Sequence, residues 1–139
     1  MKKFFKILFF IIIISIAILW LVKIFFLTHK YQIKNYNEDK IEKDIVITFN
    51  GIYGYEKQLR FIDEKLAEDG YTVVNIQYPT VNENIIEMTE KYIAPNSEEQ
   101  VKKLNEINLE RKAKNLPELK IHFVVHSMGS CLIRYYLKE

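Results

Sequence analysis

The feature that most constrains the fold of this chain is an uncharged, apolar run from Ile7 to Val22, in which Ser15 is the only polar residue. With its flanks, the run approaches the ~20 residues that a helix needs to cross the hydrocarbon core of a bilayer. It has no polar face, unlike the helices of small soluble domains. A cleaved signal peptide is the alternative, but bulky Ile24 to Phe26 occupy the place of a small-residue cleavage site. We therefore predict an uncleaved transmembrane anchor over residues 1–27.

The distribution of charge predicts the orientation of this anchor and excludes one class of partner. Lys2, Lys3 and Lys6 precede the apolar run, which favours a cytoplasmic N-terminus and an extracytoplasmic soluble part, as in a single-pass protein of the cell membrane. Residues 31–139 contain 15 basic and 18 acidic residues and so carry a net charge of −3. An acidic soluble part binds phosphates poorly, so we expect the bilayer, and no nucleic acid, as a partner.

The rest of the chain divides into a polar linker, residues 28–44, and one domain, residues 45–139. Within the linker, residues 31–36 alternate weakly and could form a short strand. The domain contains three short apolar runs rich in β-branched residues, as in strands that are buried on both faces. These runs are Ile45–Phe49, Tyr71–Ile76 and Ile121–Val125.

Segments with helical spacing separate and follow these three runs. The first helix ends at Gly70, and its core-facing residues should be Tyr55, Leu59, Ile62 and Leu66. In the long second connection we expect Pro95 to interrupt one helix and Ser97 to open another, with Gln100 as its capping-box partner. The core-facing residues of that second helix should be Val101, Leu104 and Ile107. Residues 131–137 predict a last helix.

Alternation of strands and helices predicts an α/β fold, in which crossover helices connect the strands of a parallel sheet. Ligands of such sheets bind just outside the carboxyl ends of the strands. Two of the predicted strands end in residues that suit chemistry.

The third strand ends at Val125, and His126, Ser127, Met128 and Gly129 follow it. A serine on a sharp strand-to-helix turn presents its Oγ above the sheet, and a small residue such as Gly129 permits the turn. The helix N-terminus that follows favours a developing negative charge. These features indicate a nucleophilic Ser127, and the alternative is a serine that only caps the helix.

The first strand is followed by a glycine-rich loop composed of Asn50, Gly51, Ile52, Tyr53 and Gly54. In a serine hydrolase, such a loop donates one backbone N–H to the oxyanion, and the residue after the nucleophile donates the other. These donors would be the N–H groups of Ile52 and Met128. The alternative is a plain turn that needs its glycines for conformational freedom.

Together, these parts resemble the lipase and esterase branch of the α/β-hydrolase superfamily. Its members carry His-Gly-x-x-Gly after a strand, then a strand that ends in Tyr-Pro, and later Gly- or Ala-His-Ser-Met-Gly-Gly. The corresponding segments here are Asn50–Gly54, Gly70–Pro79 and His126–Ser130, and the likeness extends over residues 45–139. The resemblance implies a partial α/β-hydrolase fold, with Ser127 as nucleophile and no cofactor or metal.

This chain departs from the family pattern at three positions. Asn50 replaces the histidine of the loop, a substitution that we expect to be tolerated because that histidine is not the catalytic base. Val125 replaces a glycine or alanine and Ser130 replaces a glycine. We expect both larger side chains to crowd the turn around Ser127.

The catalytic base of the family is missing from these residues. The family order is serine, then Asp or Glu, then His, yet the 12 residues after Ser127 include no Asp or His. His126 points away from its neighbour on a turn, His122 lies within a strand, and His29 adjoins the anchor. We thus expect a membrane-anchored hydrolase of carboxylic esters that is truncated and inactive as given. The alternative is a non-catalytic, membrane-tethered interaction module built on the same partial unit.

Overall fold

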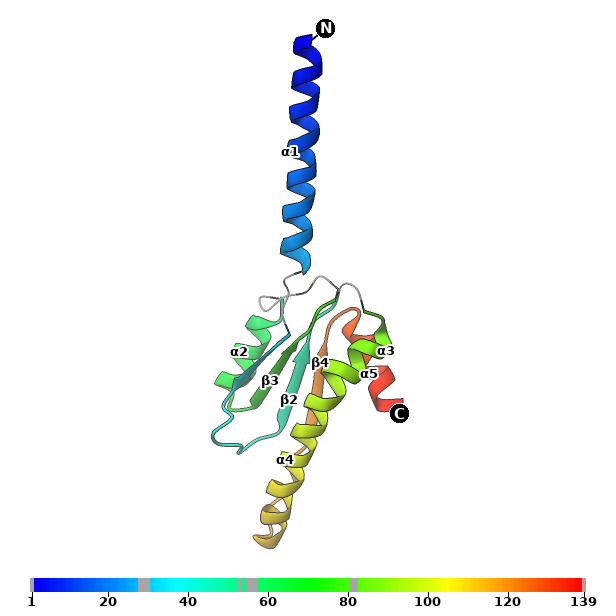
Figure 1. Cartoon of the computed structure of the whole chain (residues 1–139). Coiled ribbons are helices and arrows are strands. Elements are labelled where there is room, and N and C mark those ends of the chain that lie inside the picture. The colour runs from blue at the N-terminus through cyan, green and yellow to red at the C-terminus, as the bar shows by residue number, and fades with distance from the viewer. Residues whose placement is uncertain (1, 28–30, 53, 55–57, 81–82, 139) are drawn as a thin grey trace.

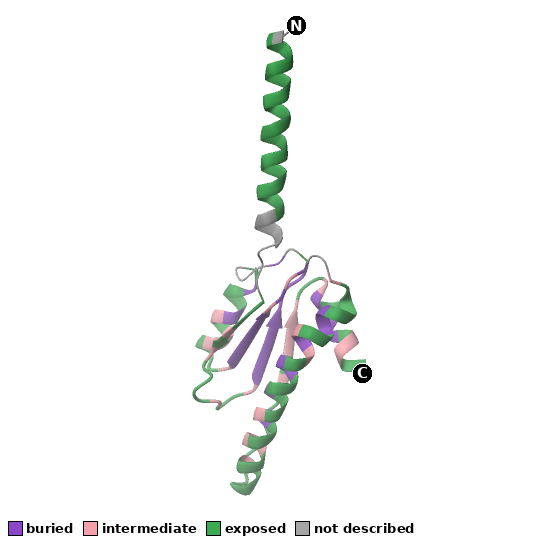
Figure 2. Ribbon diagram, viewed as in Figure 1, coloured by how far each residue is buried: buried purple, intermediate pink, exposed green. Residues whose placement is uncertain are grey.

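The structure of the protein is a computed structural model that describes residues 2–27, 31–52, 54, 58–80 and 83–138. Its first element is helix α1, Lys2–Leu27 (Figure 1). Its 26 residues rise about 39 Å at 1.5 Å each, more than the roughly 30 Å of a bilayer core. The described side chains of α1 are exposed (Figure 2), and the helix is long and apolar enough to cross a membrane.

A four-stranded sheet forms the centre of the rest of the protein. Its strands are β1 (Gln32–Tyr36), β2 (Ile45–Phe49), β3 (Thr72–Gln77) and β4 (Ile121–Val125). They are arranged in the order β1-β3-β2-β4. Strand β2 is parallel to both β3 and β4, whereas β1 pairs with β3 in the antiparallel sense. The prediction of an α/β fold with parallel strands is confirmed for β2, β3 and β4. The sheet as a whole is mixed, because the weak alternation in the linker forms the antiparallel edge strand β1.

Helices cover both faces of this sheet. Helix α2 (Arg60–Glu68) covers one face, where Thr48 of β2 contacts Asp63 of α2. The other face packs against α3 (Ile85–Met88), the π-helical turn η2 (Thr89–Ile93), α4 (Ala94–Ala113) and α5 (Gly129–Lys138) (Figure 1). Successive side chains of a strand point to opposite faces, so Phe49 lies with Leu132 of α5 in the apolar core.

The predicted interruption at Pro95 and the predicted capping box at Ser97 are wrong. Helix α4 runs through both positions, with Pro95 in its first turn, where its missing N–H costs little. The π-helical turn η2 precedes the proline and joins α3 to α4 without a break. The buried Ser97 lies inside α4, and its Oγ has no hydrogen-bond partner among the described residues. The capping box of this connection is instead formed by Asn84 and Glu87 at the start of α3.

Two of the predicted core faces are also wrong in part. On α2, Ile62 is exposed and Asp63 is buried, because Asp63 finds hydrogen-bond donors on the sheet. On α4, Val101 is exposed and Leu104 is buried. The residues of α4 that are buried along with Leu104 are polar, namely Asn96, Ser97 and Gln100, so hydrophobic spacing alone could not locate this face. Tyr55 lies outside the described residues.

Candidate functional site

The connections that follow β2 and β4 part at the carboxyl ends of these two neighbouring strands. The chain leaves β2 toward α2 on one face of the sheet and leaves β4 toward α5 on the other face. Neighbouring strands whose connections part in this way leave room for a ligand between them. The segments at this point are the loop that begins at Asn50 and the turn that contains Ser127, the two segments in which the sequence predicts a site.

Gly51 and Ser127 are in direct contact at this edge of the sheet. A Cβ atom added to Gly51 would lie 2.6 Å from Ser127 Cβ and 3.1 Å from Ser127 Oγ. Only glycine permits an approach this close. The structure therefore brings together the two loops that the sequence pattern had singled out independently.

The backbone of Ser127 adopts an unusual conformation. Its φ angle is +53°, in the left-handed region that a serine rarely occupies and that stores strain. The side chain is exposed. Gly129 permits the turn, since a Cβ there would lie 3.0 Å from the Asn50 carbonyl oxygen and 3.1 Å from that of Phe49. A strained, exposed serine between a strand and a helix is the geometry expected of a nucleophile.

The two departures that we expected to crowd this turn lie beside it. Val125 is the last residue of β4 and packs against the apolar core. Ser130 is exposed in the first turn of α5. The three atoms nearest to a Cβ at Gly51 belong to Ser127 and His126, and neither Val125 nor Ser130 is among them. The expected crowding of the turn stays a prediction.

The peptide group between Asn50 and Gly51 is held from both sides. The buried Tyr78 hydroxyl donates to the Asn50 carbonyl oxygen, and the Gly51 N–H donates to Gln58 Oε1 at 3.4 Å. Burial raises the pKa of Tyr78, which keeps this hydroxyl protonated as a donor. The next carbonyl, that of Gly51, accepts the Gly54 N–H at 2.9 Å. These contacts orient the loop that lies against Ser127.

Two backbone donors of the site are not used by the fold. Among the described residues, the N–H groups of Ile52 and Met128 have no hydrogen-bond acceptor, whereas the Gly129 N–H donates to the His126 carbonyl at 3.0 Å. These are the two groups that the sequence predicts as oxyanion donors. Tyr53 of the same loop lies outside the described residues.

No base contacts Ser127 within the described part of the chain. His122 pairs with Asp44 at 2.7 Å, and the register Val46↔His122 places this pair near the amino ends of the strands, away from Ser127. Its hydrogen bond lowers the pKa of the Asp44 carboxyl. The exposed His126 side chain makes no hydrogen bond to a described residue, and His29 lies outside the described segments. Among the described residues, no three His, Cys, Asp or Glu side chains converge on a metal position.

Two residues near the site were not predicted from the sequence. One is Tyr78, which orients the loop through its hydrogen bond to the Asn50 carbonyl oxygen. In the sequence, its Tyr-Pro dipeptide is only a part of the family resemblance. The other is Asp63, which is 1% exposed and accepts from Thr48 Oγ1 and Asn75 Nδ2, both at 2.8 Å. Burial nevertheless raises the pKa of Asp63. Polar residues at matching positions of β2 and β3 are the signal that could have located its partners.

Neither a protein-family model, nor a curated protein, nor a solved structure matches this chain. The fold and the site define a mixed α/β protein with a strained serine at the point where its sheet connections part.

Proposed function

We propose that this protein is a membrane-anchored serine hydrolase of the α/β-hydrolase type that cleaves carboxylic esters. The observation that carries the proposal is the contact between the strained, exposed Ser127 and Gly51, where the N–H groups of Ile52 and Met128 have no acceptor in the described part of the chain. The helix α1 would hold the enzyme in the cell membrane as a single span, with the soluble part on the extracytoplasmic side.

The proposed reaction is a two-step acyl transfer. Ser127 Oγ forms a bond to the ester carbonyl carbon as its proton passes to a base, and the carbonyl electron pair moves onto oxygen. The N–H groups of Ile52 and Met128 would donate to this oxyanion, and each such donor is worth roughly 10²–10³ in turnover. The tetrahedral species then expels the alkoxide, which takes the proton back from the base. Water attacks the acyl-serine in the same way and releases the carboxylic acid.

Among the described residues, no side chain that could act as the base of this reaction contacts Ser127. Removing one member of such a catalytic unit lowers turnover by ~10⁴- to 10⁶-fold. We therefore expect these 139 residues alone to hydrolyse esters negligibly. The absence of a base beside Ser127 in the described part of the chain is also the observation that favours the second candidate, a membrane-tethered interaction module in which Ser127 caps α5.

Chemical rescue distinguishes these two candidates. Exogenous imidazole can replace a missing histidine, so we expect a fluorophosphonate to modify Ser127 only when imidazole is added. The bond from Oγ to phosphorus forms, fluoride leaves, and imidazole takes the proton; peptide mass spectrometry then locates the adduct. Ser127→Ala should abolish the adduct, whereas the neighbouring Ser130→Ala should retain it. Failure of imidazole to produce any adduct at Ser127 would favour the interaction module, and rapid labelling without imidazole would contradict the missing base.

A further inference from the structure

The register of β1 determines where the anchor joins the domain. Strand β1 pairs antiparallel with β3, and its first residue, Gln32, is opposite Gln77, the last residue of β3. The chain therefore enters the domain at the carboxyl edge of the parallel strands. This is the edge at which Gly51 contacts Ser127.

The point of attachment is fixed on the domain by Tyr31. Asn96 Nδ2 donates to the Tyr31 hydroxyl at 2.7 Å, and the Tyr31 and Tyr92 ring centroids lie 5.2 Å apart. The chain from Leu27, the last residue of α1, to Tyr31 has four Cα–Cα links, which span at most about 14 Å. The end of α1 is consequently held close to this edge, as Figure 1 shows.

Exposed apolar side chains gather at the same edge. Ile52 follows the contact between Gly51 and Ser127, Phe61 lies in the first turn of α2, and Ile85 and Ile86 form the first turn of α3. We call these four residues the apolar rim. Their exposure beside a membrane anchor suits contact with lipid rather than with bulk water.

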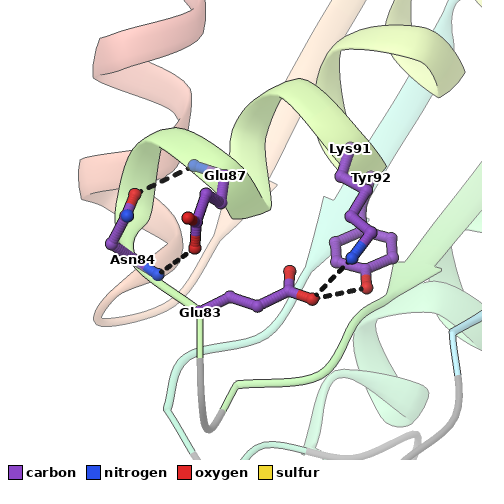
Figure 3. A network of polar contacts seen from close by, with 5 residues as sticks. All are labelled: Glu83, Asn84, Glu87, Lys91 and Tyr92. Atoms are coloured by element: carbon purple, nitrogen blue, oxygen red, sulfur yellow. Dashed lines mark hydrogen bonds and ion pairs between the residues drawn. The ribbon is translucent and has the colours of Figure 1, made fainter.

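A polar network stabilises the start of α3, the helix that carries Ile85 and Ile86 of the rim (Figure 3). The Glu87 N–H donates to Asn84 Oδ1 at 3.0 Å, and the Asn84 N–H donates to the Glu87 carboxylate at 3.2 Å, which starts α3 immediately before its two isoleucines. Glu83 accepts from the Tyr92 hydroxyl at 3.0 Å and from Lys91 at 2.8 Å. Since the Tyr92 ring also packs against the Tyr31 ring, the rim on α3 and the attachment of the anchor belong to one packed unit.

We infer that the carboxyl edge of the sheet rests on the bilayer surface and that the substrate is an ester with a long acyl chain drawn from that bilayer. This inference rests on the proposed function for its substrate, but the orientation of the domain does not depend on Ser127 chemistry. The charged side chains around the start of α3, Glu83, Glu87, Glu90 and Lys91, are mostly acidic. Contact with the membrane therefore depends on the anchor and the apolar rim, and does not require anionic lipid.

Tryptophan quenching in vesicles tests the orientation. The full chain is reconstituted in phosphatidylcholine with a brominated fraction, and Trp20→Phe removes the single native tryptophan. In that background we expect Ile52→Trp and Ile86→Trp, at positions 49% and 47% exposed, to be quenched and to emit at shorter wavelength. Leu109→Trp, at a position 70% exposed toward the far end of α4, is the matched control. Its fluorescence should be neither quenched by the brominated lipid nor shifted to shorter wavelength. Equal quenching at Leu109, or none at the two rim positions, would overturn the orientation.

Labelling of Ser127 in the same vesicles tests the substrate class. With imidazole present, a phosphonate that carries a long alkyl chain and partitions into the bilayer should label Ser127 several-fold faster than a short, soluble phosphonate. The double change Ile85→Ser and Ile86→Ser should reduce that preference and leave the rate with the soluble phosphonate unchanged. A preference for the soluble probe would overturn the lipid substrate alone. No labelling by either probe would overturn the hydrolase and its substrate together, while the quenching result would still decide the orientation.

Discussion

Gly51→Ala changes the closest contact of the candidate site by one methyl group. The new Cβ would lie 2.6 Å from Ser127 Cβ and 3.0 Å from the His126 carbonyl oxygen. The His126 carbonyl is held by the Gly129 N–H at 3.0 Å, and Ser127 is already strained at a φ of +53°. The turn after β4 therefore cannot easily shift to make room for the methyl group, so the loop after β2 must move away from it.

The size of the effect follows from this displacement. Inserting a methyl group into a packed site costs about 1–3 kcal/mol of the free energy of unfolding. The movement also shifts the Ile52 N–H, and loss of one oxyanion donor lowers the reaction rate by roughly 10²–10³. We therefore expect Gly51→Ala to reduce both the stability of the domain and the imidazole-dependent labelling of Ser127.

Gly70→Ala provides the control for this prediction. Gly70 has a φ of +88° after α2, and the nearest atom to an added Cβ, on the Lys43 side chain, is 3.6 Å away. Alanine there costs about 1–2 kcal/mol through its left-handed backbone, at the end of α2 remote from Ser127. Urea unfolding should show losses for both variants, whereas only Gly51→Ala should lose labelling. Wild-type labelling of Gly51→Ala would refute the contact between the loop and Ser127.

Four other substitutions test the contacts around the site and the fold. Tyr78→Phe removes the donor to the Asn50 carbonyl and should cost about 1–3 kcal/mol in urea unfolding, with slower labelling of Ser127; unchanged labelling would show that this hydrogen bond does not orient the loop. Burial raises the pKa of Asp63. The contribution of Asp63 to stability is therefore complete below the ordinary pKa of 3.8 and is lost as the pH rises through the folded-state pKa. Over that range, wild type should lose stability relative to Asp63→Asn. A difference that does not change with pH would contradict this. Asn84→Ala should cost about 1 kcal/mol in thermal unfolding, whereas Ser97→Ala should cost nothing, since the buried Ser97 Oγ has no partner among the described residues; the reverse ranking would restore the capping box predicted at Ser97.

The strands were the most predictable part of this fold. Ile45–Phe49 and Ile121–Val125 begin and end where the sequence predicts them, because buried parallel strands are continuous apolar runs bounded by polar residues. The meeting of Gly51 with Ser127 was predictable for a related reason, since neighbouring parallel strands end at the same edge of the sheet.

Features that depend on tertiary partners were not predictable. The burial of Asp63 needs donors from Thr48 and Asn75, which are distant in sequence. Likewise, the Tyr78 hydroxyl donates to a backbone carbonyl rather than to a side chain. The residue types in the sequence therefore do not predict this hydrogen bond. A serine followed three residues later by a glutamine matches a capping box in sequence, yet the π-helical turn before Pro95 carries the helix past that position.

The direction of a single strand decides which end of the domain the helix α1 adjoins. If β1 were parallel to β3, the anchor would attach at the amino edge of the sheet, the edge that carries His122 and Asp44, about 17 Å from the Ser127 edge for strands of five residues. The observed register, from Gln32↔Gln77 to Tyr36↔Val73, excludes this arrangement along the whole of β1. In the proposed orientation, the antiparallel edge strand, which contributes least to the core, is therefore the element that brings the candidate nucleophile to the lipid surface.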